Sequence, residues 1–247
     1  MHDPAALGEQ MTSEHASRYA FVHGVRRTRQ TLEVWRDGPW RVLGRWFALS
    51  FAIAILLLLA VWAVAGVSET NGLTVEVTSP PFAIGDVNDA FAIFAKNLLV
   101  LAFHAMACVA GFIAGSSLPL QAEQQKSRLM RAIHHRGGQI AIAFVIAATT
   151  FSLSAQALLI GADAAGVAER LHTTPAVLLV GLLAHAPLEL TALFLPLAAW
   201  ISASRRGDWD QLLAATLVTV IIALPMLLAA AFIEVFVSPH VLHALLG

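Results

Sequence analysis

Residues 175–203 read "PAVLLVGLLAHAPLELTALFLPLAAWISA", and this stretch decides the fold. It contains two ionisable side chains, His185 and Glu189, in an otherwise uncharged run. A helix needs roughly 20 apolar residues, at a rise of about 1.5 Å each, to cross a hydrocarbon core. The stretch therefore predicts a transmembrane helix that carries a histidine and a carboxylate.

The rest of the chain has the same character. Hydrophobic residues make up 58% of the 247 residues and charged residues only 13%, which is more apolar surface than a soluble domain can bury. Four further apolar runs lie near Trp46–Val67, Ala90–Leu118, Ile140–Gly161 and Leu212–Val237. The sequence predicts an all-α, polytopic transmembrane helix bundle of about five spans.

Charge divides the chain into segments. We expect a basic N-terminal cytoplasmic segment (1–45), a membrane domain (46–239) and a short external tail (240–247). Arginine and lysine gather in the first segment and in the connections after the second and fourth runs, whereas the connection 68–89 has none. By the positive-inside rule, the N-terminus is cytoplasmic and the C-terminus external.

The N-terminal segment has two interpretations. Its arginines and scattered aromatic residues fit a helix that lies along an anionic inner leaflet, or a plain basic anchor for the first span. Gly38-Pro39 is expected to break any helix before that span begins.

Polar residues recur within the predicted spans. They are Lys96, Asn97 and His104 in the second, Gln156 in the third, His185 and Glu189 in the fourth, and Glu234 in the fifth. A charge at mid-bilayer costs about 2.5 kcal/mol or more, so these side chains should face protein or a water-filled cavity. They form either interhelical hydrogen bonds, each contributing about 0.6 kcal/mol, or a functional cavity, and both interpretations stay open.

The spacing suggests which of these residues meet. His185 and Glu189, spaced i, i+4, share one helix face. A short connection makes the fourth and fifth spans antiparallel neighbours, which brings Glu234 towards His185. We expect Lys96 to be the counter-ion of Glu234 and His104 to lie near Glu189, in a polar pocket that opens outward.

The sequence predicts no enzyme, cofactor or metal site. It contains no HExxH, GxSxG, P-loop or GxGxxG motif, and no catalytic residue can be assigned. Two potential ligands on one helix are weak evidence for a metal.

Glycines and prolines predict local features of the bundle. Gly111 and Gly115 form a GxxxG pattern, which would let another helix approach closely. Pro187, Pro196 and Pro225 should bend or interrupt the fourth and fifth spans.

Several stretches resemble one family. "LLAHAPLELTALFL" resembles the "PHGxxEL" signature of the stage II sporulation protein M family, and "LLAAAFIEVFVSP" is similar to its closing "AAFIEAFITP" pattern. "FAIFAKNLLVLAFHAMACVAGFIAG" resembles the span that usually carries an Asn-Asn pair, and "SAQALLIG" resembles the following "NGxxLG" segment. The resemblance covers roughly Ala90 to Pro239.

The chain also departs from the family pattern. Lys96 replaces the first Asn of the pair, Gln156-Ala157 replaces Asn-Gly, and Ala186 replaces the Gly after the histidine. A shared fold is expected, but an identical partner or ligand does not follow.

The resemblance implies a non-catalytic protein of the bacterial cytoplasmic (inner) membrane. In spore formers, the family member works with membrane and secreted partners, including peptidoglycan-degrading enzymes, in septal wall remodelling. Our hypothesis is a membrane scaffold in a cell-envelope assembly, whose partners are the lipid bilayer and other envelope proteins, peptidoglycan hydrolases among them. We expect no nucleic-acid partner, and an oligomer is compatible with the sequence. The alternative is an ion- or proton-coupled transporter or channel subunit that uses the polar pocket.

Overall fold

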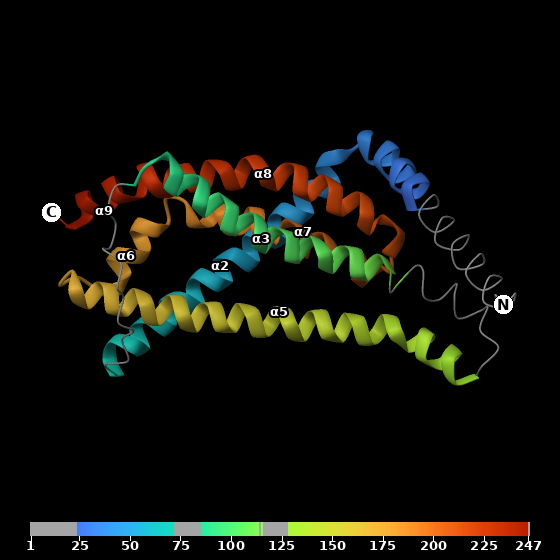
Figure 1. Cartoon of the computed structure of the whole chain (residues 1–247), viewed down its shortest axis with the longest axis horizontal. Helices are drawn as coiled ribbons and strands as arrows, with labels where there is room; N and C mark the ends of the chain where they lie inside the picture. The colour runs from blue at the N-terminus through green and yellow to red at the C-terminus, as the bar shows by residue number, and fades with distance from the viewer. Residues whose placement is uncertain (1–23, 72–84, 114, 116–127, 247) are drawn as a thin grey trace, which may run out of the picture.

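The structure, a computed structural model, describes residues 24–71, 85–113, 115 and 128–246 (Figure 1). Within these ranges the secondary structure is helical. The elements are a helical segment over 24–36, α2 (Pro39–Asn71), α3 (Val87–Phe112), α5 (Arg128–Arg170), α6 (Pro175–Leu182), α7 (Ala186–Arg206), a 3-10 turn (Trp209–Gln211), α8 (Leu212–Phe236) and α9 (Ser238–Leu246). The predicted all-α class is confirmed.

Among the described residues, five helical stretches are long and apolar enough to cross a membrane, as predicted: Pro39–Asn71, Val87–Phe112, Ile142–Arg170, Ala186–Arg206 and Trp209–Leu246. The chain is a multi-pass membrane protein. In Figure 1, α2 and α5 end and α3 and α6 begin at the end of the bundle where the C-terminus lies. The opposite end holds the start of α2, the start of α5 and the turn between α7 and α8.

The helices run further than the apolar runs that predicted them. α2 begins at Pro39, so the expected boundary between 1–45 and 46–239 falls within a helix, and α5 extends from Arg128 to Arg170. Most of the predicted tail, 240–247, belongs to α9. Backbone hydrogen bonds continue beyond the membrane core, where hydropathy no longer marks the helix.

The expected break before the first span is present. The helical segment 24–36 ends there, the N–H of Gly38 donates to the carbonyl of Trp35 (3.1 Å), and α2 begins at Pro39. Proline fits the first turn of a helix because its missing N–H would have no helical partner there.

The fourth predicted span is not one helix. α6 ends at Leu182, α7 begins at Ala186, and residues 183–185 turn between them. Pro187 lies in the first turn of α7, where it has no N–H to donate to the carbonyl of Leu183, four residues earlier, so a continuous helix would lose a hydrogen bond there. Pro196 and Pro225 lie inside the continuous helices α7 and α8, so the expected interruption occurs only at Pro187.

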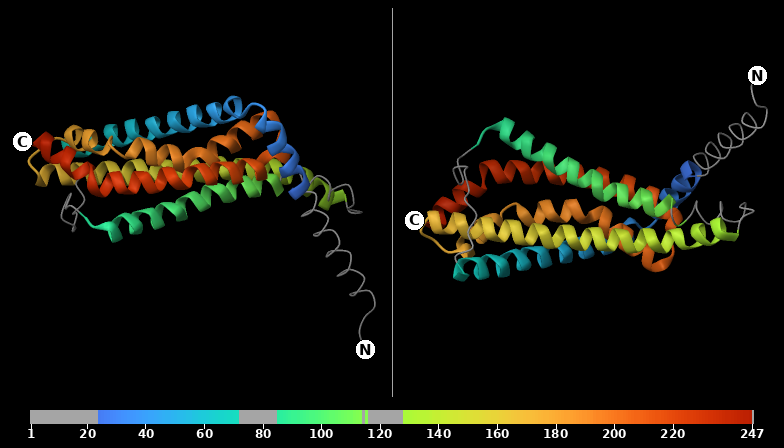
Figure 2. Two further views of the ribbon diagram at one scale, coloured as in Figure 1. Left: turned by 90° about the horizontal axis from the view of Figure 1, so that it is seen from above. Right: turned by 60° about the horizontal axis from the view of Figure 1, so that its bottom comes forward.

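α7 is the central helix of the bundle. It packs against α2, α3 and α8, and every residue from Thr191 to Trp200 is buried. Figure 2 shows α7, in orange, running among these neighbours, while α5 lies along α2. A helix that is apolar on all sides belongs in such a core.

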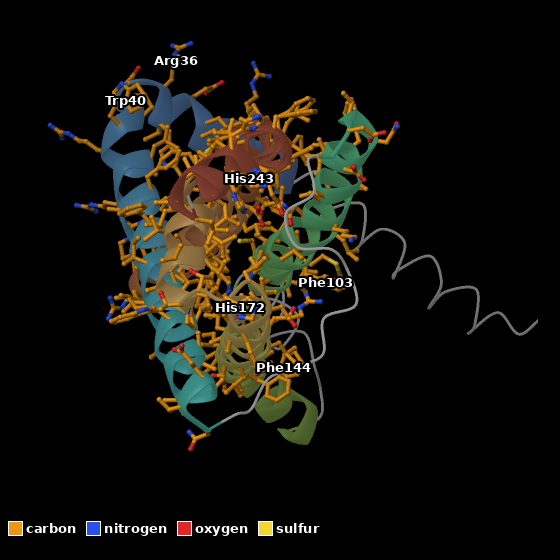
Figure 3. All side chains as sticks on the ribbon, turned by 90° about the vertical axis from the view of Figure 1, so that its left-hand side faces the viewer. Arg36, Trp40, Phe103, Phe144, His172 and His243 are labelled. Atoms are coloured by element: carbon orange, nitrogen blue, oxygen red, sulfur yellow. The ribbon has the colours of Figure 1, made fainter. Side chains whose placement is uncertain are left out.

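The outer helices present apolar side chains to the surroundings. Phe103 of α3 and Phe144 of α5 are 64% and 71% exposed and lie at the edge of the bundle (Figure 3). Large apolar groups over such a surface are expected where lipid replaces water as the solvent.

Candidate functional site

His185 lies in the turn between α6 and α7 and is only 6% exposed. Its carbonyl accepts hydrogen bonds from the N–H groups of Leu188 and Glu189, both at 3.0 Å. Its side chain reaches α9, where Nδ1 lies 2.7 Å from Ser238 Oγ. The helix break thus creates a buried imidazole that is held at both its backbone and its ring.

Ser238 bonds to one nitrogen of this ring. When its hydroxyl donates to the carbonyl of Ile233, 3.3 Å away, its oxygen can accept from the Nδ1–H of His185. In the tautomer that is protonated at Nδ1, Nε2 carries a lone pair and no proton. The unprotonated nitrogen faces Glu234, whose Oε2 is 4.0 Å away.

Glu189 completes a group of three. It lies one turn after His185 on α7, whereas Glu234 comes from α8, and the two glutamates and the histidine can place one ligand atom each within 4.8 Å of one another. We call His185, Glu189 and Glu234 the His–Glu cluster. The expected approach of Glu234 to His185 is therefore observed.

The electrostatics of the cluster are unfavourable without a further positive charge. Glu189 and Glu234 are both partly buried and close enough to repel each other. Two carboxylate charges in a poorly solvated site are costly, and a shared proton or a bound cation relieves the repulsion. The His–Glu cluster can hold either a shared proton or a bound cation.

α3 supplies two polar neighbours. The amide of Asn97 lies against Glu189, but its Nδ2 is buried and has no well-aligned hydrogen-bond partner within the described part of the chain. Lys96 is exposed, and it acts on Glu234 electrostatically without forming a direct ion pair with it. The expected pair of Lys96 and Glu234 is present only as this longer-range interaction.

Two predicted residues have other neighbours. His104 Nδ1 is 3.1 Å from the Val100 carbonyl, and its ring packs edge-on against Phe194 of α7. Gln156 donates to Ser152 Oγ, one turn earlier on α5. The structure does not bring these two side chains into the His–Glu cluster.

Gly111 and Gly115 do lie against other elements, and in each case the side chain that they contact is a tryptophan. A Cβ on Gly111 would lie 2.7 Å from Trp200 Nε1, and one on Gly115 would overlap Trp209. A Cβ on Gly161 of α5 would instead lie 2.9 Å from a backbone atom of another helix, the Val61 carbonyl of α2. A lone glycine carried no signal in the sequence that could identify this contact.

Ser238 was also missed by the sequence reasoning. It lies four residues after Glu234, within the stretch "FIEVFVSP", and one helical turn is the spacing at which side chains share a face. That signal could have associated it with the polar cluster.

One comparison with known proteins gives a match. Residues 139–239 match the family model described as Stage II sporulation protein M. No curated protein and no solved structure shows a match. The matched segment includes most of α5, all of α6, α7 and α8, and the whole His–Glu cluster. Lys96 and Asn97 precede it.

The sequence resemblance to the stage II sporulation protein M family is thus confirmed for the C-terminal part of the membrane bundle, residues 139–239.

Proposed function

We propose that the protein is a non-catalytic scaffold of a cell-envelope assembly in the bacterial cytoplasmic membrane. The observation that carries the proposal is the family match over residues 139–239. The resemblance implies partners that remodel peptidoglycan, and a membrane scaffold would hold such partners at the septal or lateral wall.

The packing of the bundle supports this role. The matched segment contains α7, which is enclosed by α2, α3 and α8. A central helix buried along most of its length favours one fixed arrangement of its neighbours. Such a rigid bundle presents constant surfaces at its two ends, as a scaffold requires.

The proposed orientation has the N-terminus in the cytoplasm and the C-terminus outside. Arg41 and Arg45 of α2 and Arg205 and Arg206 of α7 belong to the helix ends that meet at one end of the bundle. Positive charge of this kind favours the cytoplasmic side.

Co-purification tests the scaffold. The tagged chain, extracted in a mild detergent, should retain a peptidoglycan hydrolase or another envelope protein, identified by mass spectrometry. An unrelated five-span protein with the same tag and expression level is the control. Depletion should change wall shape or division and leave solute uptake normal. A chain that purifies alone, in cells whose wall is normal after depletion, would contradict the scaffold.

A second candidate is an ion- or proton-coupled transporter or channel subunit. The observation that favours it is the helix break at 183–185, next to a histidine and two carboxylates. Broken helices with ionisable groups often line transport sites. Purified protein in liposomes should then dissipate an ion or proton gradient, and Glu189→Gln should slow the flux, whereas Glu169→Gln should leave it unchanged. Absence of flux under both gradients would exclude this candidate.

A further inference from the structure

We propose that the His–Glu cluster binds one divalent transition-metal cation, such as Zn²⁺ or Mn²⁺. The cation would tie the first turn of α7 to the last turns of α8. This inference goes beyond the scaffold role and does not depend on it, because it rests on the His–Glu cluster and its polar neighbours.

The distances suit a metal site. Three ligand atoms within 4.8 Å of one another share a point no more than about 2.8 Å from each. Bonds from Zn²⁺ to nitrogen and oxygen ligands are about 2.0–2.2 Å long. Small rotations of the two glutamate side chains would close the difference, and the ion would replace their repulsion with attraction.

The ligand types indicate the class of metal. One imidazole nitrogen with two carboxylates suits first-row transition metals, whereas Mg²⁺ and Ca²⁺ prefer sites made of oxygen alone. Asn97 lies close to the cluster, since its amide lies against Glu189, and only its amide oxygen could act as a fourth ligand. The amide oxygen or a water molecule would complete a four-coordinate site.

The hydrogen bonds of His185 provide an independent argument. Histidines that ligate metals usually donate their other ring N–H to a fixed acceptor, which sets the tautomer and orients the ring. Ser238 Oγ lies 2.7 Å from Nδ1 and is itself bonded to the carbonyl of Ile233. In the tautomer that is protonated at Nδ1, the nitrogen that faces Glu234 is the one with a free lone pair.

Charge balance favours the same conclusion. Two ionised carboxylates and a neutral imidazole carry two negative charges, which a divalent cation neutralises. Lys96 is the positive side chain that acts on Glu234, but it is exposed and makes no direct ion pair with it. Its charge should weaken metal binding without occupying the site.

Metal titration tests the proposal. The full chain, purified with a streptavidin-binding tag and without a histidine tag, is stripped with EDTA and titrated with Zn²⁺ or with Mn²⁺. Elemental analysis should find about one tightly bound equivalent per chain, and binding should raise the unfolding temperature. His185→Gln and Glu234→Gln should each weaken binding at least roughly tenfold. The matched controls His243→Gln and Glu169→Gln should bind as the wild type does.

The Lys96→Gln variant is a separate test of metal binding that leaves the proposed ligands unchanged. Removing this positive charge should tighten metal binding several-fold, since a like charge near the site is lost. Variants are compared only when they elute as single species in gel filtration. The proposal is wrong if the wild type binds neither metal, or if correctly folded Glu234→Gln and Lys96→Gln both keep wild-type affinity. These experiments measure metal content and metal affinity. A negative result would therefore contradict the metal site without contradicting the scaffold role.

Discussion

Ser238 shows how much one hydroxyl decides at the scale of single residues. It is buried at the start of α9, accepts from the Nδ1–H of His185 and donates to the Ile233 carbonyl. The imidazole is fixed through it, and the ring in turn faces Glu234. The geometry of the His–Glu cluster therefore depends on a residue that would not itself bind an ion.

Ser238→Ala should destabilise the protein by about 1–3 kcal/mol, because a buried ring N–H loses its acceptor. Ser238→Thr keeps a hydroxyl and should recover part of this loss. Thermal unfolding in detergent measures the effect. Ser204→Ala is the matched control, since the Ser204 hydroxyl bonds only within its own helix, to the Ile201 carbonyl. Equal losses in the alanine variants at 238 and 204 would show that Ser238 has no special role.

At the scale of elements, close contact between helices depends on where a glycine, which has no side chain, lies between them. Gly161 lets α5 approach α2, because a Cβ there would lie 2.7 Å from Val64 and 2.9 Å from the Val61 carbonyl. The carbonyl belongs to the backbone of α2 and cannot turn aside as a side chain can.

Gly161→Ala should therefore force α5 away from α2 and cost about 1–3 kcal/mol, as overpacking does. Gly66→Ala, on α2, is the control, because a Cβ at Gly66 meets nothing within 4 Å. It should be neutral or stabilise by up to about 1 kcal/mol, through helix propensity. The unfolding temperatures of the two variants are measured in the same detergent. If the two temperatures are equal, the contact of Gly161 with α2 does not contribute to stability.

The start of α3 shows how a helix end is stabilised. Asp86 is its N-cap: the carboxylate accepts from the N–H groups of Asn88 (2.7 Å) and Asp89 (3.1 Å), and the Asp89 side chain accepts from the N–H of Asp86 (2.8 Å). The Asp89 N–H above all, then the Asn88 side chain and N–H, lower the pKa of Asp86 below its usual value.

This lowered pKa predicts a pH dependence. The cap is ionised and at full strength above the usual pKa of aspartate, and it weakens as the pH falls through the lower, folded value. Amide protection at Asn88 and Asp89, corrected for intrinsic exchange, should therefore fall on acidification. In Asp86→Asn, which still caps but does not titrate, protection should not change over the same range. The same pH profile in both proteins would rule out Asp86 as its source.

At the scale of the whole molecule, the five spans put the helical segment 24–36 and the C-terminus at opposite ends of the bundle (Figure 1). An odd number of crossings requires this arrangement. With the proposed orientation, the end where α2 begins is cytoplasmic.

Cysteine labelling tests that orientation. Cys108 is buried, with its thiol 3.1 Å from the Pro196 carbonyl, so Cys108→Ser is a suitable background. An impermeant thiol reagent should label Asn71→Cys and His243→Cys in intact spheroplasts, and Asp37→Cys only after permeabilisation. All three positions are exposed. Labelling of Asp37→Cys in intact spheroplasts would reverse the orientation.

Composition and the spacing of apolar runs were enough to predict the all-α class and the five spans, because insertion into a bilayer depends on the length and hydropathy of each segment. The family match of residues 139–239 was predicted from the resemblance of particular motifs instead. The break at 183–185 agrees with the expected bend or interruption at Pro187, since proline cannot bond to the carbonyl four residues earlier, whereas Pro196 and Pro225 lie in continuous helices. The proximity of His185 and Glu234 followed from a short connection between antiparallel helices.

Only the tertiary structure decided which polar side chains meet. Lys96 was the expected partner of Glu234, yet His185 lies 4.0 Å from that carboxylate and Lys96 makes no direct pair with it. His104 packs against Phe194 and Gln156 bonds within α5. The sequence determines how deep a residue lies along its helix, through a constant rise per residue. The rotation of each helix about its axis is set by packing against several neighbours at once, and this rotation selects the side chains that face one another.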